Sequence, residues 1–387
     1  MAGFCSLPNS CHNKITVGMI NLIKDLLRSI YFLCSIQFLR MALLWTFSVA
    51  FSHYQLFKDS LFSHKIVSYP RSSPSTFPNK PVCVITGATS GLGLSTACKL
   101  SKEGYVVVIV GRSEQLLSEA ITKIKGWNED AHLKAFQADL SSVESIIKFS
   151  TSLRQWLLDS DLHCSVQILI NNAGILATSP RVTTEGYDKM IATNYIGPFV
   201  MTKLLLPLLE SSPVSSKIVN VTSFTHRAVT NMQVDEGTVS GKRFLKSKQY
   251  PYAQIYEYSK LCLLLFSYEL HRQLCQMGKS HQIFVNVADP GVVQTNIMRE
   301  VPASLSWVAF FVLKRLRLLE SFESGNDSII DAALTPPGTS GVYFFGGKGR
   351  TINSSALSQD TKLAHELWET TSDLLSVTPF GNKRNNF

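Results

Sequence analysis

Short apolar runs alternate with longer stretches of helical periodicity along most of this chain, and that alternation restricts the fold more than any other feature. The runs are rich in β-branched and aromatic residues, which favour strands. Several are apolar throughout, as strands buried on both faces of a parallel sheet are. They cover Val82–Thr86, Tyr105–Val110, Leu133–Phe136, Val166–Ile170, Lys217–Val221, Phe284–Val287 and Val342–Phe345. We therefore expect an α/β fold: a single Rossmann-type, doubly wound parallel sheet of about seven strands with helices on both faces.

Composition divides the chain into three parts. Residues 1–67 form a hydrophobic, basic leader, residues 68–80 are rich in Pro and Ser and predict a linker, and residues 81–387 have the length of one doubly wound domain. The formal net charge is +9, and residues 1–80 contribute eight Lys and Arg against only Asp25 and Asp59. No basic and aromatic stripe recurs beyond the leader, so nucleic-acid binding is not expected.

The leader holds two apolar stretches. Apolar residues recur at near-helical spacing over Ile15–Ile30, and Ser29–Phe51 contains 23 mostly apolar and aromatic residues, enough to span a bilayer. Arg40, near the middle of the second stretch, would have to be buried in protein or reach the interface. We expect membrane association; a cleaved transit segment and a helix packed on the domain are the alternatives.

A glycine-rich segment follows the first predicted strand. It reads Thr86-Gly87-Ala88-Thr89-Ser90-Gly91-Leu92-Gly93 and precedes a helical stretch, Leu94–Ser101. Glycines let the backbone turn tightly and approach a pyrophosphate, whose charge the amides at the helix N-terminus meet. This segment is therefore expected to bind a dinucleotide through Thr86, Gly87, Ser90, Gly91, Leu92 and Gly93.

Further cofactor-binding residues are expected where the next strands end, because open α/β sheets bind ligands at the carboxyl edge of the sheet. Arg112 stands where a fold that binds NAD would usually have an acid for the ribose hydroxyls, and a cation there favours a 2′-phosphate. NADP(H) is thus favoured over NAD(H), and a solvated loop arginine is the alternative. The same edge is expected to carry Asp139, Leu140, Asn172, Ala173 and Gly174.

Four polar residues form the candidate catalytic set: Asn194, Ser223, Tyr256 and Lys260. Tyr256 and Lys260 are four residues apart in the helical stretch Ala253–Leu274, so they share one face. An ammonium near the phenol should lower the tyrosine pKa from about 10, so that Tyr256 can give or take a proton. Ser223 would hydrogen-bond the reacting oxygen, and Asn194 would hold a water that links Lys260 to solvent.

With these residues the chain resembles the short-chain dehydrogenase/reductase superfamily over residues 80–300. The segment Tyr256–Leu261 resembles the branch of retinol dehydrogenases and WW-domain oxidoreductases. Ser340–Arg350 is similar to the plant FOREVER YOUNG oxidoreductases, also described as chloroplast-envelope-translocon-like dehydrogenases. The resemblance implies that Asp139 meets the adenine amino group, that Thr295 meets the nicotinamide carboxamide, and that further cofactor contacts come from Tyr256, Lys260, Pro290 and Gly291.

The chain departs from the family pattern in three places. Ser223 and Tyr256 lie 33 residues apart, which predicts an insertion at the mouth of the active site with the basic residues Lys242, Arg243, Lys246 and Lys248. Asp289 replaces the histidine that relatives often have before Pro-Gly, which bears on the chemistry of the substrate pocket. Leu305–Leu313 is apolar and would line a pocket for a lipophilic carbonyl, dip into a membrane, or form a core helix.

Together these features predict an NADP(H)-dependent oxidoreductase that interconverts an alcohol and a carbonyl on a small lipophilic molecule, with Tyr256 as proton donor or acceptor. NAD(H) stays open as the cofactor, and a nucleotide-binding redox sensor or scaffold with little turnover is the alternative function. The spacing TGxxxGxG disfavours an epimerase or dehydratase. Eight cysteines without a CxxC pair indicate free thiols in a reducing compartment. We expect no metal site and a location at the chloroplast envelope or endoplasmic reticulum; homo-oligomer formation is left open.

Overall fold

A seven-stranded parallel sheet with the order β3-β2-β1-β4-β5-β6-β7 forms the centre of the molecule. The structure, a computed structural model, describes residues 23–27, 29–62, 68–72 and 80–378. The chain builds the sheet outward from β1 to β3, then crosses back and builds β4 to β7 on the other side. The direction of winding therefore reverses between β1 and β4, which is where open α/β sheets leave a ligand crevice.

All seven predicted strands are present, each within two residues of its expected bounds, and the predicted fold class is confirmed. Six of the seven are buried along their whole length, as strands of a sheet covered by helices on both faces are. The exception is β3, a half-buried edge strand. The strands are β1 (Val82–Thr86), β2 (Val106–Gly111), β3 (Leu133–Gln137), β4 (Ile168–Asn171), β5 (Ser216–Val221), β6 (Ile283–Asp289) and β7 (Tyr343–Phe345).

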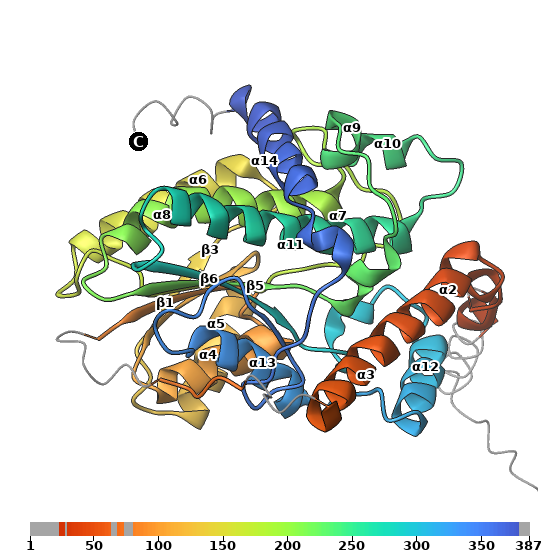
Figure 1. Ribbon diagram of the computed structural model, residues 1–387, viewed down its shortest axis with the longest axis horizontal. Coiled ribbons are helices and arrows are strands. Elements are labelled where there is room, and N and C mark those ends of the chain that lie inside the picture. Colours follow the sequence, from red (N-terminus) through yellow and green to blue (C-terminus); the bar gives the residue numbers. More distant parts are fainter. Residues whose placement is uncertain (1–22, 28, 63–67, 73–79, 379–387) are drawn as a thin grey trace, which may run out of the picture.

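Helices cover both faces of the sheet (Figure 1). One face carries α4 (Gly91–Lys102), α5 (Glu114–Trp127) and α13 (Phe322–Ala333). The other carries α6 (Val143–Leu158), α8 (Gly197–Glu210), α11 (Tyr252–Gln276) and α14 (Thr361–Ser376). Serine side chains define where some of these helices begin: Ser113 accepts the amide of Leu116, and Ser142 accepts that of Ser145.

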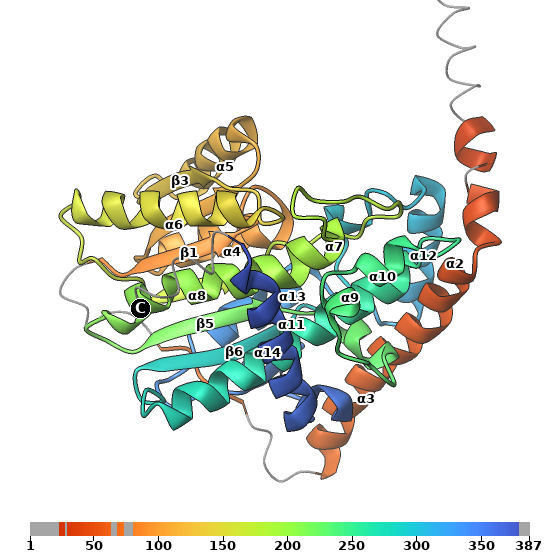
Figure 2. The same ribbon diagram turned by 90° about the horizontal axis from the view of Figure 1, so that it is seen from above.

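The leader packs against the domain through three consecutive helical segments: α2 (Ile36–Arg40), the π-helix η1 (Met41–Trp45) and α3 (Thr46–Phe62). They contact α11 and the 3-10 turn η3 (Phe224–Ala228), and α12 (Ala303–Arg315) lies beside them (Figure 2). Within the described residues, no single helix has both the length and the apolar composition to cross a bilayer. Ile23–Leu33 and Ile36–Asp59 meet those criteria only as a pair, and the pair is bent by 66°.

The regions predicted at the edges of the leader are only partly described. Of the expected amphipathic stretch Ile15–Ile30, residues 15–22 and 28 lie outside the described residues, as do residues 73–79 of the linker. The described part of the linker is tied to the domain, because Arg71 pairs with Asp327 and Asp331 of α13.

Candidate active site

The turn between β1 and α4 is held against the end of β4. The Thr86 hydroxyl oxygen accepts the amides of Asn172 and Ala173 at 3.0 and 3.1 Å. Gly87 has a φ of +67°, and a Cβ on Gly93 would lie 2.4 Å from both the Gly87 carbonyl and the Asn172 side chain. These two glycines are therefore required by backbone conformation and by close approach.

A polar cleft of about 250 Å³ opens above this turn. Its floor is backbone at the N-terminus of α4, where amides and the helix dipole suit a phosphate. The predicted cofactor residues that line it are Gly87, Ser90, Gly91, Leu92, Gly93, Arg112, Leu140, Asn172, Ala173, Gly174, Tyr256, Lys260, Pro290, Gly291 and Thr295. A crevice floored by glycines and amides, with a cation at its rim, fits a dinucleotide.

Two predicted cofactor residues do not line the cleft. Thr86 is fully buried and pins the turn instead, as described above. Asp139 accepts both the amide and the hydroxyl of Ser141 through one oxygen, at 2.9 and 2.7 Å. Burial opposes its ionisation, but these bonds, Lys189 and Arg112 outweigh burial and lower the pKa of Asp139. The cleft also has a lining residue that the sequence did not suggest, the cation Arg299.

The four candidate catalytic residues come together at the inner end of the cleft. All four are buried. The Lys260 ammonium lies 5.7 Å from the centre of the Tyr256 ring and donates to the Val221 carbonyl at 3.0 Å. A Cβ on Gly174 would lie 3.5 Å from both the Lys260 nitrogen and the Asn194 amide oxygen. The structure therefore brings the four candidate side chains together at one point.

Asn194 is placed by a π-helical turn, η2 (Ala192–Ile196), between the short helix α7 (Lys189–Ile191) and α8. Such single turns widen a helix locally and are frequent at functional sites. The Asn194 oxygen accepts the Ile175 amide at 2.8 Å, and its nitrogen donates to the Ile175 carbonyl and the Ser259 hydroxyl. Asn194 thus fixes the strand-end loop beside Lys260.

The electrostatics of the site differ from the sequence prediction in one respect. Burial, and secondarily the Asp289 carboxylate, raise the pKa of Tyr256, although a hydrogen bond with Ser223 lowers it. The expected lowering by Lys260 is not found, because desolvation of the phenolate dominates. Burial also lowers the pKa of Lys260 to about 8, against the raising effect of Asp289. At neutral pH the tyrosine keeps its proton.

Asp289 lies behind the site and lines neither cavity, so it can act on the chemistry of the substrate pocket only from a distance. One carboxylate oxygen accepts the Tyr343 hydroxyl at 2.6 Å, and the other accepts the Gly291 amide at 2.9 Å. Burial raises the pKa of Asp289 to about 6, so it is ionised at the pH where Lys260 loses its proton. Its charge reaches the site through the field it exerts on Lys260 and Tyr256.

Asp289→Asn is expected to shift the pH dependence of turnover. The carboxylate raises the pKa of both Lys260 and Tyr256, so removing its charge should lower both. The alkaline midpoint of the pH–kcat profile should therefore move to lower pH. Asp327→Asn, which removes a carboxylate from α13 away from the site, is the control and should leave the midpoint in place. An unmoved midpoint in Asp289→Asn would show that its field does not control the proton transfer.

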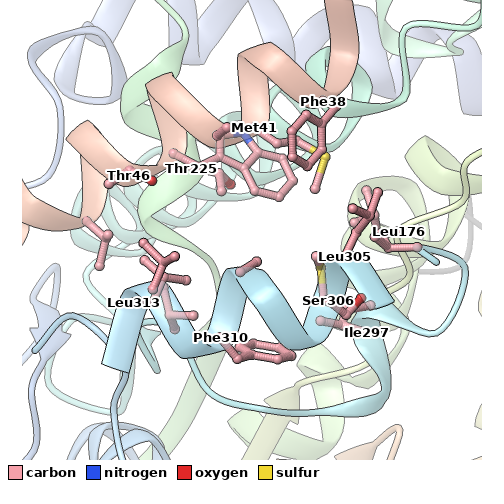
Figure 3. Close-up of a pocket in the computed structure, with 18 of the residues that line it drawn as sticks. Phe38, Met41, Thr46, Leu176, Thr225, Ile297, Leu305, Ser306, Phe310 and Leu313 are labelled. Carbon is pink, nitrogen blue, oxygen red and sulfur yellow. The ribbon is translucent and has the colours of Figure 1, made fainter. Parts of the chain in front are cut away.

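A second cavity, apolar and about 330 Å³ in volume, adjoins the inner end of the cleft. Ser223 and Tyr256 line both cavities. Figure 3 shows Phe38 and Met41 of the leader on one side and Leu305 and Leu313 of α12 on the other. Leu305–Leu313 therefore belongs to a half-exposed helix that lines a pocket, and it is not a core helix.

The basic insertion does not stand at the mouth of either cavity, contrary to expectation. It forms the short helices α9 (Glu236–Val239) and α10 (Lys242–Leu245), and α9 packs against α14. Residues 229–255 are all described, and none of them lines the polar cleft or the apolar cavity. Part of the wall of the apolar cavity comes instead from the leader, for which the sequence favoured membrane association and left packing on the domain as an alternative.

Comparison with known proteins places these features in a family. Residues 81–234 match the family model of short chain dehydrogenases. Human polyprenol dehydrogenase is 32% identical over 310 residues, 78% of this chain and 87% of that protein. The chloroplastic short-chain dehydrogenase TIC 32 B of Brassica napus is 31% identical over 304 residues, 76% of this chain and 89% of that protein. Human retinol dehydrogenase 13 is 29% identical over 309 residues, 79% and 87% of the two chains.

Solved structures show the same fold. An uncharacterised protein from Mycobacterium paratuberculosis superposes with a TM-score of 0.57 at 24% identity and covers 79% of this chain and 97% of that one. The angucycline C-6 ketoreductase LanV, solved with bound NADP, gives a TM-score of 0.54 at 21% identity, with 70% and 95% covered. The seven-stranded sheet with its covering helices therefore also occurs in other proteins of known structure.

Proposed function

Because this chain belongs to the short-chain dehydrogenase/reductase family, we propose that it is an NADP(H)-dependent oxidoreductase that interconverts an alcohol and a carbonyl on a small lipophilic molecule. One observation carries the proposal: Ser223 and Tyr256 line both the polar cleft and the apolar cavity. A molecule in the apolar cavity would present its oxygen to the same two hydroxyls that face the end of the cleft. The cleft would hold the cofactor, which supplies or accepts the hydride when bound.

The chain's own residues would handle the proton. The buried Tyr256 hydroxyl keeps its proton at neutral pH and can donate it to a carbonyl oxygen. Ser223 accepts the Thr225 amide through its oxygen, so its hydrogen can be donated to the same substrate oxygen. The Lys260 ammonium, beside the ring, would favour the phenolate that remains after transfer, against the stronger opposing effect of burial.

The substrate class follows from the walls of the apolar cavity. They are almost entirely aliphatic and aromatic side chains, with the hydroxyls of Ser223 and Tyr256 at one end. The names of the relatives, polyprenol and retinol dehydrogenases, describe proteins that act on apolar molecules with one hydroxyl. We therefore expect isoprenoid-like primary alcohols or their aldehydes to bind here.

A substrate screen tests this function directly. The purified full-length protein would be assayed by NADPH absorbance with retinal, farnesal, a steroid ketone and a small polar ketone. Turnover of the apolar carbonyls, with little turnover of the polar one, is the expected result. Tight binding of NADPH without turnover of any carbonyl or alcohol would favour the alternative, a nucleotide-binding sensor or scaffold.

We also propose membrane association, because the leader and α12, which line the apolar cavity, expose further apolar side chains on their outward sides. Exposed apolar side chains of the leader, among them Leu39, Leu43 and Phe47, lie on the segment that borders α12, which exposes Trp307 and Phe311. Lys314 and Arg315 follow in the last turn of α12. Apolar side chains bordered by cations suit the surface of an anionic bilayer.

The membrane proposal predicts co-sedimentation of the full-length protein with vesicles that contain phosphatidylserine. The double substitution Trp307→Gln/Phe311→Gln should weaken binding at least tenfold, since each buried aromatic contributes roughly 1.5–3 kcal/mol. Trp127→Gln, which removes another exposed tryptophan, from α5, is the control and should bind like the wild type. Equal sedimentation of the double variant and the wild type would move the contact to another surface.

A further inference from the structure

Glu257, the residue that follows the proposed catalytic tyrosine, has a buried carboxylate, which is unusual for an acidic side chain. Glu257 lies in α11, and its side chain is fully buried. Burial raises the pKa of Glu257, whereas Arg40 and Trp45 lower it. An unpaired charge in such a position would be strongly destabilising, so its partners must hold it in place.

Both partners come from the leader, more than 200 residues away in the sequence. The Arg40 guanidinium donates from Nε to both Glu257 oxygens at 2.9 and 2.8 Å and from Nη2 to Oε2 at 2.5 Å. The Trp45 indole nitrogen donates to Oε1 at 2.8 Å. The carboxylate is therefore satisfied on both oxygens by one cation and one indole.

The π-helix η1 makes this arrangement possible. Arg40 directly precedes η1, and Trp45 is its last residue. Positions five apart do not share a face of a regular α-helix. A π-turn closes its hydrogen bonds over five residues, and so it brings Arg40 and Trp45 to the same side. Arg40, a cation that does not suit a membrane-spanning helix, thus attaches the leader to α11.

The anchored segment is also the wall of the apolar cavity. Phe38, Met41 and Trp45 line the cavity together with Tyr256. The Trp45 ring lies 5.6 Å from the Tyr256 ring. A shift of α2 and η1 away from α11 would therefore widen the cavity along its length without moving Ser223 or Lys260.

We propose that Arg40, Trp45 and Glu257 form a latch that seats the leader on the active site, and that this seat sets the enzyme's preference for substrates with long apolar chains. The inference rests on the proposed function. Arg40 and Trp45 are positioning residues: they hold the wall that a chain would contact beyond the reacting carbon. The latch makes the leader a part of the substrate site.

Other contacts hold the leader on either side of the latch. Phe32 stacks on Tyr252 with ring centres 5.5 Å apart. Arg227 donates to Ser52 at 3.0 Å and to Gln55 at 3.2 Å. Loss of the latch should therefore let the segment between Phe32 and Ser52 move, while the leader stays attached to the domain at those two residues.

The test is Arg40→Met in the full-length protein, with n-butanol and n-dodecanol as substrates. The KM for n-dodecanol is expected to rise about tenfold, while the KM for n-butanol and both kcat values change less than twofold. Loss of binding that is equal in ground and transition states raises KM alone. Arg40→Lys, which keeps a charge but loses the fork, should fall between the wild type and Arg40→Met.

Arg71→Met is the matched control. It also removes an arginine from a buried carboxylate, Asp331, but far from both cavities. It should unfold more easily, as Arg40→Met should, and yet keep the preference for the long alcohol. A fall in kcat or a rise in KM that is equal for both alcohols in Arg40→Met would overturn the latch.

Hydrogen exchange separates this inference from the proposed function. In the wild type and in Arg71→Met, n-dodecanol should slow hydrogen exchange of the amides of residues 38–52. In Arg40→Met, n-dodecanol should leave the exchange of these amides unchanged. This readout needs no turnover. If no alcohol is oxidised yet the protection follows this pattern, the proposed reaction fails and the latch stands. If the wild-type leader shows no protection, the latch fails whatever the activity.

Discussion

Tyr256→Phe is expected to lower kcat by a factor on the order of a thousand while NADPH binds as before. The substitution removes only the hydroxyl that we propose exchanges the proton, and the ring still fills its place between Trp45 and Lys260. Turnover of the best substrate from the screen and the NADPH dissociation constant, measured by fluorescence, would be compared between the two proteins.

Tyr258→Phe serves as the control for this experiment. Tyr258 lies on the same helix, but its hydroxyl is exposed and donates to the Asn231 carbonyl. Its loss should leave kcat within a factor of about two, since exposed groups contribute little. Equal turnover by Tyr256→Phe and the wild type would assign the proton transfer to another group.

Arg112→Asp is expected to reverse the cofactor preference. Arg112 lines the rim of the cleft after β2, and its guanidinium can pair with a 2′-phosphate that NAD(H) lacks. A charge-assisted hydrogen bond contributes roughly 1.5–3 kcal/mol, so the wild type should prefer NADPH over NADH by about ten- to a hundredfold. An aspartate removes the attraction and adds repulsion, so the variant should bind NADH more tightly than NADPH.

Arg112→Ala divides this effect into its two parts. It removes the attraction without adding a negative charge, and it should bind the two cofactors with nearly equal affinity. Titration of NADPH and NADH against the wild type, Arg112→Asp and Arg112→Ala gives the affinity of each protein for each cofactor. A wild type that binds both cofactors equally well would leave Arg112 as a solvated loop residue.

Local sequence patterns predicted the sheet and most of the cleft well, because each feature there depends on neighbours in the chain. The strand Val82–Thr86 and the turn that ends at Gly93 are short, contiguous signals. Tyr256 and Lys260 share a face through helical spacing alone. The topology of a doubly wound sheet then brings the strand ends together, so the cluster around Ser223 followed from order along the chain.

The packing of the leader was harder to predict from the sequence, because periodicity shows that a helix has an apolar surface but does not show what covers that surface. Arg40 counted against a simple span, yet its partner Glu257 could not be identified across so long a separation. The π-turn at η1 leaves no signature in a pattern that assumes a regular period. The environment of Tyr256 was likewise hidden, because the proximity of Lys260 could be predicted and the degree of burial could not.

The two cavities are built largely from different parts of the chain. The proposed specificity for the cofactor and the proposed specificity for the substrate therefore depend on different elements. The polar cleft is formed mainly by strand ends and the turns that follow them, so its shape is tied to the sheet. The apolar cavity takes much of its wall from α2, η1 and α12, which lie outside the sheet and its covering helices. Under the proposed function, substitutions in those three elements would change which substrates are accepted and leave the polar cleft intact, so the range of substrates would diverge between descendants of such a chain while the sheet stays the same.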